Sequence, residues 1–179
     1  SASTIPEQYI LPNLLMTFNG LYPHITYKIN HLDSFEIIES IKDCKIPYGF
    51  TGSFFKDSSL EYLSIMKDEL VLITPIDFEN NSTVISLKDL LTIPLVIREE
   101  GSGTRNLFAK ELKKHKINIY DLNIKAMAEN TQTIKSLVQS GICCSILSAK
   151  AIENEVNLGL LKKYTITDLN LERDFYFVY

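Results

Sequence analysis

Strand-like and helix-like segments alternate along most of this 179-residue chain. In the first part the pattern predicts a helix that follows Pro6 and Glu7, from Tyr9 to about Gly20, a strand at 26–30, a helix at 34–42, a short strand at 48–52 and a strand at 69–74. In the helix at 34–42, Phe35, Ile38 and Ile41 are expected on one face. Such alternation implies a parallel sheet covered by helices, because parallel strands need crossover connections.

The alternation begins again after a polar stretch at 77–83. The pattern then predicts a short helix at 86–91 with Ser86 as its cap, a strand at 95–97, helices at 106–116 and 133–140, strands at 124–128 and 142–147, a helix near 149–155, and strands at 163–166 and 174–179. Two successive β-α-β units favour two small α/β lobes over one long sheet. With 45% hydrophobic and 22% charged residues, the chain is of globular type and can bury one good core or two small ones.

The charge and hydropathy of the chain exclude several classes of protein. A net charge of −4 argues against binding of a nucleic-acid backbone by this chain alone, since such binding needs a clustered basic face. The cluster Lys110, Lys113, Lys114 and Lys116 is mixed with Glu111, so we interpret it as a solvated helix face. The longest apolar runs are strand-sized, which predicts no membrane span, and no secretion signal is visible at the N-terminus.

Cysteines and histidines predict neither a metal site nor a disulfide framework. The three cysteines are an odd number without ligand-like spacing, and Cys143 and Cys144 lie in an apolar run where small buried residues pack well. We therefore expect structural cysteines in a reduced, cytoplasmic setting. The histidines His24, His31 and His115 lie on separate segments with no ligand motif beside them, so no metal and no cofactor is predicted.

The segment from Arg98 to Arg105 carries the clearest ligand signal. It follows a strand-like run and opens a helix, and the first N–H groups of a helix attract anions. Gly101 and Gly103 allow close approach of the backbone, while the hydroxyls of Ser102 and Thr104 can donate to an oxyanion. Arg98 and Arg105 are two of the only three arginines in the chain, and both flank this loop. The segment therefore predicts an anion site.

Ordinary turn and capping chemistry explains the same residues about equally well. The segment is not a phosphate-binding P-loop, since no Gly-Lys-Ser/Thr follows, and it lacks the third glycine of a dinucleotide fingerprint. Glu99 and Glu100 are unfavourable beside an anion unless they point outward or pair with Arg98 and Arg105. The choice between ligand binding and capping stays open at this point.

An ordered set of segments resembles the effector-binding domain of LysR-type transcriptional regulators. The segments are Ser3-Thr4-Ile5-Pro6, Leu11-Pro12 with Phe18 and Tyr22-Pro23, Gly49-Phe50, residues 68–73, residues 85–90, residues 98–105 and residues 138–142. The resemblance covers nearly the whole chain. It rests on the order of these segments, because none of them is specific alone.

The resemblance implies an α/β fold similar to type 2 periplasmic binding proteins. Two Rossmann-like subdomains are joined by crossover strands, with residues 1–73 and 167–179 in the first and residues 74–166 in the second. A small effector is expected between the lobes. The family also carries an N-terminal winged helix-turn-helix that binds DNA, and nothing like it is present in these residues. The family usually closes with a further helix after the last strand, whereas this sequence stops at Tyr179.

Four short segments are the candidate effector-binding residues. They are Ser3, Thr4 and Ile5; Gly52 and Ser53; Ser102, Gly103 and Thr104; and Thr131 and Gln132. The first is the segment that the family commonly places at the effector, and Gly52-Ser53 follows a strand at its carboxyl end, where open α/β sheets bind ligands. For Ser3-Thr4 and Gly52-Ser53, a plain helix cap or turn explains the residues as well as ligand binding does. For Thr131 and Gln132, a capping role is more typical than ligand binding.

We therefore expect a sensor that binds a small oxyanion or compact carboxylate in the cytoplasm and thereby controls transcription. A solute-binding receptor of a transport system is the alternative, because it shares the fold. No nucleophile paired with histidine and no metal-binding pattern indicates an enzyme. The implied partners are DNA, through the missing N-terminal domain only, and a second copy of the domain, with a homotetramer for the full-length protein. No membrane partner is predicted.

Overall fold

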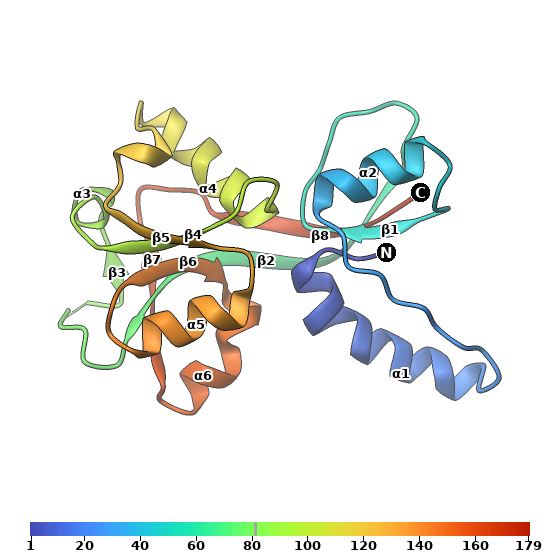
Figure 1. The fold of residues 1–179 in the computed structure, drawn as a ribbon, viewed down its shortest axis with the longest axis horizontal. Coiled ribbons are helices and arrows are strands. Elements are labelled where there is room, and N and C mark those ends of the chain that lie inside the picture. The colour runs from blue at the N-terminus through green and yellow to red at the C-terminus, as the bar shows by residue number, and fades with distance from the viewer. Residues whose placement is uncertain (81) are drawn as a thin grey trace. The chain divides into compact units, whose positions relative to one another are not determined.

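The computed structural model describes residues 1–80 and 82–179 (Figure 1). The chain forms two compact units, residues 1–68 with 173–179 (unit 1) and residues 69–172 (unit 2). The chain passes from unit 1 to unit 2 inside strand β2 (Tyr62–Pro75) and returns at the start of β8 (Glu172–Val178). The lobe boundaries predicted from the sequence, 73/74 and 166/167, remain a prediction.

Unit 1 opens with a helix that changes type. A π-helix, η1 (Pro6–Ile10), leads into α1 (Leu11–Leu21), and the N–H of Leu11 donates to the carbonyl of Pro6, five residues earlier. Pro12 explains this wider turn, because it has no N–H and its ring displaces the carbonyl four residues before it. Helix α1 carries no charged side chain and leaves Met16 and Leu21 about 70% exposed. The predicted helix is therefore present, but it begins earlier than predicted, at Pro6, and its first turn is irregular.

The sheet of unit 1 is antiparallel and is packed against one helix. Strand β1 (Gly49–Thr51) pairs with β8, and β8 lies next to β2. Helix α2 (Ser34–Lys42) begins with a capping box between Asp33 and Glu36. A core cluster forms between this helix and the strands, from Ile37, Ile38, Ile41, Leu60 and Val178.

The buried face of α2 differs from the predicted one. Residues 34, 37, 38 and 41 are buried, as the helical repeat requires, whereas Phe35 is 54% exposed. The prediction that Phe35 shares the face of Ile38 and Ile41 is therefore wrong. Phe35 instead meets Phe55 edge to face at the surface, with ring centroids 6.2 Å apart.

The predicted strand at 26–30 is also wrong. Residues 26–30 form no ladder, and the isolated bridge of Ala2 lies just beyond them, at His31, while Ala2 also bridges to Phe50. Ile25, Tyr27 and Ile29 are 39–47% exposed, so the alternating apolar residues face no core. A strand needs a neighbouring strand for its N–H and C=O groups, and sequence alternation does not show whether one is present.

Unit 2 contains a mixed sheet. Strand β4 (Leu95–Arg98) lies between β5 (Ile124–Ala128) and β6 (Cys144–Ser148) and is parallel to both. Strand β2 is antiparallel to β6 and to β7 (Leu161–Ile166), and β3 (Val84–Ile85) runs parallel to β7. The predicted parallel arrangement is correct for β4, β5 and β6 and for the pair of β3 and β7, but not for β2. Alternation describes the local connections, but not the direction of a strand that arrives from another unit.

Two helices cover the two faces of this sheet, α4 (Gly103–Lys114) on one side and α5 (Thr131–Gln139) on the other (Figure 1). The smaller helices of unit 2 are α3 (Leu87–Leu90), η2 (Ile119–Asp121), η3 (Ala149–Ile152) and α6 (Glu153–Asn157). Ser86 caps α3, as predicted. The helix predicted near 149–155 is instead a 3₁₀ turn followed by a short α-helix.

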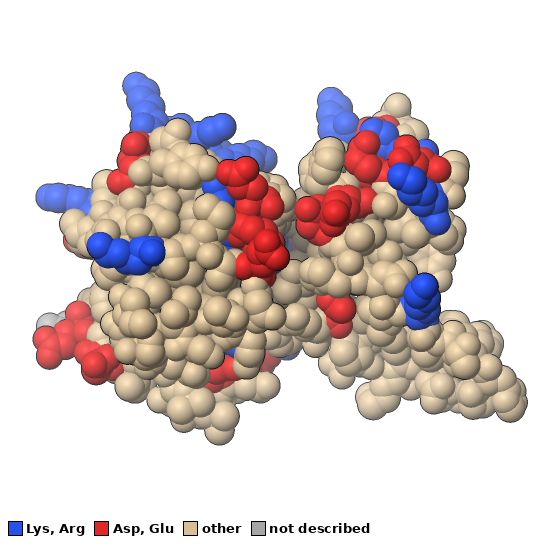
Figure 2. Space-filling view, in the orientation of Figure 1, with Lys and Arg blue, Asp and Glu red and all other residues tan. Residues whose placement is uncertain are grey.

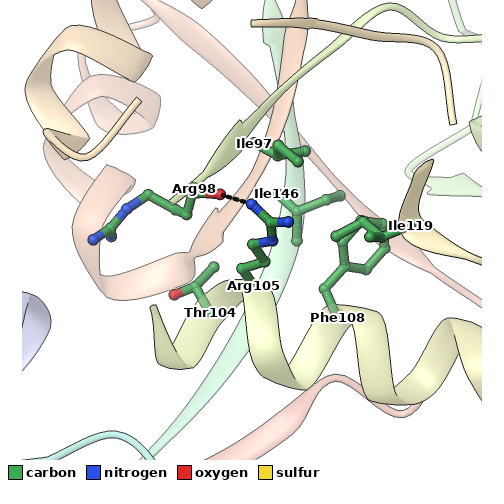
Figure 3. A pocket seen from close by; sticks show the side chains of 7 residues that line it. All are labelled: Ile97, Arg98, Thr104, Arg105, Phe108, Ile119 and Ile146. Carbon is green, nitrogen blue, oxygen red and sulfur yellow. Dashed lines mark hydrogen bonds between the residues drawn. The ribbon is translucent and has the colours of Figure 1, made fainter. Parts of the chain in front are cut away.

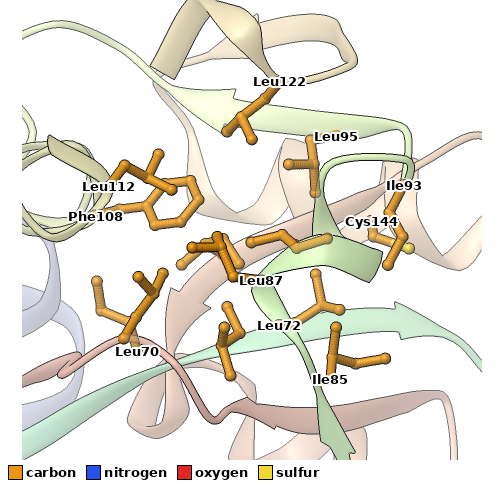
Figure 4. Close-up of a cluster of buried hydrophobic side chains, with 14 of the residues drawn as sticks. Leu70, Leu72, Ile85, Leu87, Ile93, Leu95, Phe108, Leu112, Leu122 and Cys144 are labelled. Atoms are coloured by element: carbon orange, nitrogen blue, oxygen red, sulfur yellow. The ribbon is translucent and has the colours of Figure 1, made fainter. Parts of the chain in front are cut away.

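The larger core of the molecule lies in unit 2 (Figure 4). Phe108 and Leu112 of α4 pack with Leu70 and Leu72 of β2 and with Cys144 of β6. Each fully buried side chain of this size contributes roughly 1.5–3 kcal/mol relative to an exposed one. This core holds the ends of β4, β5 and β6 in place, and the helix starts described next follow those ends.

Candidate functional site

Three strands of unit 2 end at one edge of the sheet, and polar segments follow each of them. Because β4 is parallel to β5 and to β6, the carboxyl ends of all three lie at the same edge. Ser102 and Gly103 begin α4 after β4, Thr131 begins α5 after β5, and Ser148 ends β6. The candidates Ser102, Gly103, Thr104 and Thr131 therefore come together at this edge.

Arg98 links the ends of two of these strands. Its side chain is 4% exposed, and its Nε and Nη2 atoms donate to the two carboxylate oxygens of Glu99, each at 2.7 Å. Its Nη1 atom donates to the hydroxyl of Thr131 at 3.3 Å. The buried guanidinium is thus paired with a carboxylate through two parallel hydrogen bonds, and a third bond connects it to the first residue of α5.

Arg105 is held by a second network. Its Nη1 atom donates to the carbonyl of Arg98 at 3.2 Å (Figure 3). The same atom lies 3.4 Å from the sulfur of Met127. Its Nη2 atom donates to Tyr120 at 2.9 Å and to Glu100 at 3.1 Å. Glu99 and Glu100 therefore pair with the two arginines, which removes their conflict with an anion nearby.

A small cavity lies behind the start of α4. It is lined by Ile97, Arg98, Thr104, Arg105, Phe108, Ile119 and Ile146 and has a volume of about 10 Å³ (Figure 3). Such a volume has room for about one water molecule. The cavity is therefore far too small for an organic effector.

The structure distinguishes capping residues from the others at this edge. Asn130 caps α5, since its side chain accepts from the N–H groups of Gln132 and Thr133 at 2.8 and 3.1 Å. Ser102 precedes α4 but makes no capping bond with its side chain, and Thr104 lies inside the helix with 4% of its surface exposed. The typical cap role expected for Thr131 and Gln132 is therefore wrong, because the residue before them fills it.

Thr131 and Gln132 also differ from each other. Thr131 is 1% exposed and accepts the bond from Arg98, whereas the side chain of Gln132 is exposed. Both helices start earlier than predicted, α4 at Gly103 and α5 at Thr131. Gly103 is thus the first helical residue rather than part of the loop.

In unit 1, the candidates Ser3, Thr4 and Ile5 stand at the start of the first helix. The N–H of Ser3 donates to the carbonyl of Phe50 in β1 at 2.9 Å, and the carbonyl of Ser3 accepts from Glu7. Ile5 is 4% exposed, so its side chain belongs to the core. The bond from Ser3 to Phe50 brings this segment to β1, which leads directly into Gly52 and Ser53.

Gly52 is required by packing. A Cβ atom at this position would lie 2.8 Å from Phe175, with Arg173 3.5 Å away. Arg173 is stacked on Phe175, its guanidinium carbon 4.7 Å from the ring centre, and pairs with Asp68 at 2.9 Å. Ser53 bonds back to the hydroxyl of Thr51 in a local turn. These contacts support the alternative of an ordinary turn at Gly52-Ser53. The buried cation beside the turn, Arg173, was not predicted from the sequence.

Sequence reasoning missed Arg173, Asp68, Asn130 and Ser148. Arg173 had one signal, since it is the third of only three arginines. Asn130 stands directly before α5 and is a typical cap residue. The pairing of Asp68 with Arg173 had no sequence signal, because 105 residues separate them.

The cysteines of unit 2 are buried, as predicted. Burial raises the pKa of the Cys144 thiol to about 12, with a smaller contribution from neighbouring Cys143, while Cys44 is exposed. His31 bonds to Glu7 through its Nδ1 atom at 2.5 Å. Within residues 1–80 and 82–179, no three His, Cys, Asp or Glu side chains form a group that could hold a metal ion. No helix in that part of the chain has the length and hydropathy for a membrane span.

The lysine cluster on α4 and just beyond its end is exposed to solvent, as predicted. Lys110, Lys113, Lys114 and Lys116 are exposed, and Lys114 pairs with Glu111 at 2.7 Å. Figure 2 shows Lys and Arg side chains gathered on the outer side of α4.

A family model, the LysR substrate binding domain, matches residues 1–179. The chain belongs to this family. Its relatives include the uncharacterized HTH-type transcriptional regulator MJ0300 of Methanocaldococcus jannaschii, which is 30% identical over 178 residues, 99% of this chain and 60% of that protein. The chain thus spans about 60% of the length of this relative.

Solved structures of LysR-type regulatory domains have the same fold. The regulatory domain of CcmR from Synechocystis PCC6803, in complex with 2-PG, matches with a TM-score of 0.87 and 21% identity, over 99% of this chain and 84% of that one. The effector-binding domain of QuiR, in complex with shikimate, matches with a TM-score of 0.83 and 19% identity, over 99% and 83%. These likenesses confirm the predicted type 2 periplasmic-binding-protein-like α/β fold.

The LysR family assignment confirms the resemblance seen in the sequence. The domain is the effector-binding domain of a LysR-type regulator, and the alternative of a transport receptor is not favoured. The family is not a class of enzymes.

Proposed function

We propose that this domain senses a small oxyanion or compact carboxylate, and that Ser102, Gly103, Thr104 and Thr131 form the unit 2 part of its binding site. The observation that carries the proposal is the start of α4. Ser102 is 5% exposed, yet its side chain does not cap the helix. The N-terminus of a 12-residue helix attracts negative charge, so the hydroxyl and the first N–H groups suit an oxyanion.

The ligands of the neighbouring structures support the same chemical class. CcmR is in complex with 2-phosphoglycolate (2-PG) and QuiR with shikimate, and both molecules carry a carboxylate. Gln132 is proposed as a peripheral contact, since its side chain is exposed beside Thr131.

Ser3, Thr4, Ile5, Gly52 and Ser53 are proposed as the unit 1 contribution. Ser3 and Gly52 are both buried, and the N–H of Ser3 donates to the carbonyl of Phe50, two residues before Gly52. Ile5 can contribute only its backbone, because its side chain lies in the core. We propose that effector binding changes the balance between conformations of the protein, which is how a sensor acts on an attached domain.

The role of the whole protein is part of the same proposal. The attached domain is proposed to be an N-terminal winged helix-turn-helix, since the chain spans only 60% of its HTH-type relative. Control of transcription then depends on DNA contacts made by that domain. The setting is the cytoplasm, and the sensor itself catalyses no reaction.

We propose further that the domain is a homodimer, and the full-length protein a homotetramer. The support is α1, which has no charged residue and leaves Leu14, Met16, Phe18 and Leu21 exposed. Exposed apolar patches of this kind mark protein contacts. Replacing Met16 and Leu21 with Glu should give a folded monomer by light scattering, and a dimer that survives both changes contradicts the use of α1.

A thermal-shift screen tests the effector class. Sulfate, phosphate, shikimate and 2-phosphoglycolate are added separately at matched ionic strength. A ligand at ~100 times its dissociation constant should add about 2.7 kcal/mol to the unfolding free energy. That corresponds to a rise on the order of 5–10 °C in melting temperature.

Variants then locate the site. Ser102→Ala and Thr104→Ala should each weaken binding about tenfold, the loss of one hydrogen bond to a charged group. Ser136→Ala is the matched control, because Ser136 is exposed on α5 and bonds only within its own helix. Full binding by both variants would place the effector elsewhere. Thr4→Ala tests the unit 1 residues in the same way.

A further inference from the structure

We propose that Arg98 is the carboxylate-recognising residue of this domain. Its Nε and Nη2 atoms form a fork of two donors, and we propose that Glu99 occupies this fork in place of the ligand carboxylate. A carboxylate effector then binds by displacing Glu99. The inference rests on the proposed function, because it names the cation of that site and narrows the ligand class from oxyanions to carboxylates.

The geometry of the pair is that of a bound carboxylate. Nε and Nη2 of Arg98 meet the two oxygens of Glu99, both at 2.7 Å. Two parallel bonds of this length are what an arginine offers to a planar carboxylate ligand. The fork therefore has the shape of a carboxylate site, and the chain itself supplies the occupant.

Burial identifies which partner can leave. The Arg98 side chain is 4% exposed and the Glu99 side chain 22%. Arg98 is the last residue of β4, inside the sheet, whereas Glu99 lies just beyond the strand. The carboxylate is thus the member that reaches solvent, while the guanidinium stays in place.

The buried charge favours exchange over simple loss. Loss of Glu99 without a replacement would leave the charge of Arg98 only partly solvated, which is unfavourable. An incoming carboxylate that replaces Glu99 keeps the charge paired and returns the Glu99 carboxylate to water. Binding is therefore an exchange of one carboxylate for another, which selects ligands of the same planar geometry.

The position of the fork connects it with the other candidate residues. Nη1 of Arg98 donates to Thr131, whose hydroxyl lies at the start of α5. In Figure 3 the guanidinium of Arg98 points away from the small cavity and from Arg105. A ligand carboxylate on Arg98 would thus lie beside Thr131, at the edge where α4 and α5 begin.

Arg105 does not share this arrangement. Its partners include the carbonyl of Arg98, Met127 and Tyr120, and its acidic partner Glu100 is 76% exposed. Removal of Glu100 leaves these other contacts in place. Glu100 is therefore the matched control for Glu99.

The experiment is rescue of a Glu99 variant by acetate, a small carboxylate that resembles the end of the missing Glu side chain. Glu99→Ala should lower the melting temperature, and acetate should restore it in a saturable way. The rise should be roughly 3–6 °C at about ten times the dissociation constant. Sulfate and chloride at the same ionic strength should have little effect.

Two further variants make the result specific to the fork. Glu100→Ala should show no acetate response, and neither should the double variant Arg98→Lys with Glu99→Ala, because lysine keeps the charge but lacks the fork. If Glu99→Ala does not fold, Glu99→Gln takes its place. Glu99→Gln should also bind at least about tenfold more tightly any carboxylate that stabilises the unchanged protein, since the competitor is weakened.

These outcomes test the exchange of Glu99 for a ligand carboxylate separately from the proposed sensor function. A destabilised Glu99→Ala protein that acetate does not rescue, or that sulfate rescues equally, overturns the inference. An effector that stabilises the unchanged protein but binds no better to Glu99→Gln also overturns it, while the sensor function stands. Acetate rescue that requires Arg98 supports the inference even if the effector screen fails.

Discussion

Each unit of the molecule buries an arginine beside candidate binding residues, and the two arginines are paired in different ways. In unit 1, Arg173 and Asp68 are 7% and 2% exposed, so both charges are removed from water. In unit 2, Arg98 is 4% exposed but its partner Glu99 is 22% exposed. The first pair is closed to solvent on both sides, and the second is open on the side of its carboxylate.

The difference in exposure indicates that the pair of Arg173 and Asp68 stabilises packing, whereas the pair of Arg98 and Glu99 has the exposure that the proposed ligand exchange requires. Asp68 and Arg173 join β2 and β8 within unit 1, and Arg173 also stacks on Phe175 behind Gly52. Glu99 contributes to no strand and is the direct neighbour of its partner. A closed pair fixes the backbone around it, while an open pair can exchange its anion.

The largest expected effect contrasts the two carboxylates. Asp68→Ala should lower the unfolding free energy by about 3–5 kcal/mol, because it removes the carboxylate that pairs with a buried guanidinium. Glu99→Ala should cost only about 1–2 kcal/mol, since water can reach Arg98 where the carboxylate was. Urea denaturation at neutral pH measures both. Equal losses would show that the two pairs are equivalent and would remove the contrast.

The next effect concerns glycines of unit 1. Gly52→Ala should destabilise by about 1–3 kcal/mol, because its Cβ would lie 2.8 Å from Phe175. Gly20→Ala is the control, since Gly20 in α1 has no atom within 4 Å of the added Cβ, and it should stabilise by up to about 1 kcal/mol. Thermal melts of both variants check this. A neutral Gly52→Ala that weakens effector binding would make Gly52 a ligand contact instead of a packing residue.

Smaller effects are expected at the two helix starts of unit 2. Asn130→Ala should cost about 1 kcal/mol, because its side chain caps α5 through two N–H groups. Ser102→Ala should cost under about 0.5 kcal/mol, since its side chain does not cap α4. Chemical denaturation distinguishes them. A loss at Ser102 as large as that at Asn130 would identify Ser102 as a cap and argue against its role in binding.

The smallest effect is on thiol reactivity. Exposed Cys44 of unit 1 should react with iodoacetamide at pH 8, whereas Cys144 of unit 2 should not, because its pKa is raised to about 12. In the unfolded chain the Cys144 thiol ionises near pH 9, so its raised pKa lowers the stability of the folded protein only as the pH rises above that value toward 12. Mass spectrometry of the labelled protein checks the first point. Equal labelling of Cys144 in the folded state would contradict its burial.

Much of unit 2 followed from local sequence. Strand β5 has the predicted bounds, and β4 and α4 differ from prediction at their ends only. These elements have strong apolar periodicity and both ends marked by turn residues. Their order also placed Ser102–Thr104 and Thr131 at the ends of parallel strands. The role of each hydroxyl did not follow, because a cap and a ligand contact use the same residue types.

Unit 1 was predicted less well, for reasons that involve distant residues. The segment 26–30 alternates like a strand, but it pairs with no strand, and the isolated bridge of Ala2 lies beyond it at His31. The buried face of α2 depends on Leu60 and Val178, which lie far from it in sequence. Local patterns carry no information about which distant segment supplies the partner.

The sequence by itself determined the alternation of elements, the glycine and hydroxyl junction before α4, and the family. These depend on hydrophobic periodicity, turn chemistry and the order of short segments, all of which are local properties. Only the tertiary structure decided that β2 runs antiparallel to its neighbours in unit 2, that Glu99 fills the fork of Arg98, and that Arg173 pairs with Asp68. Strand direction and the pairing of buried charges depend on which groups meet in the core, where low polarity makes each unpaired group costly.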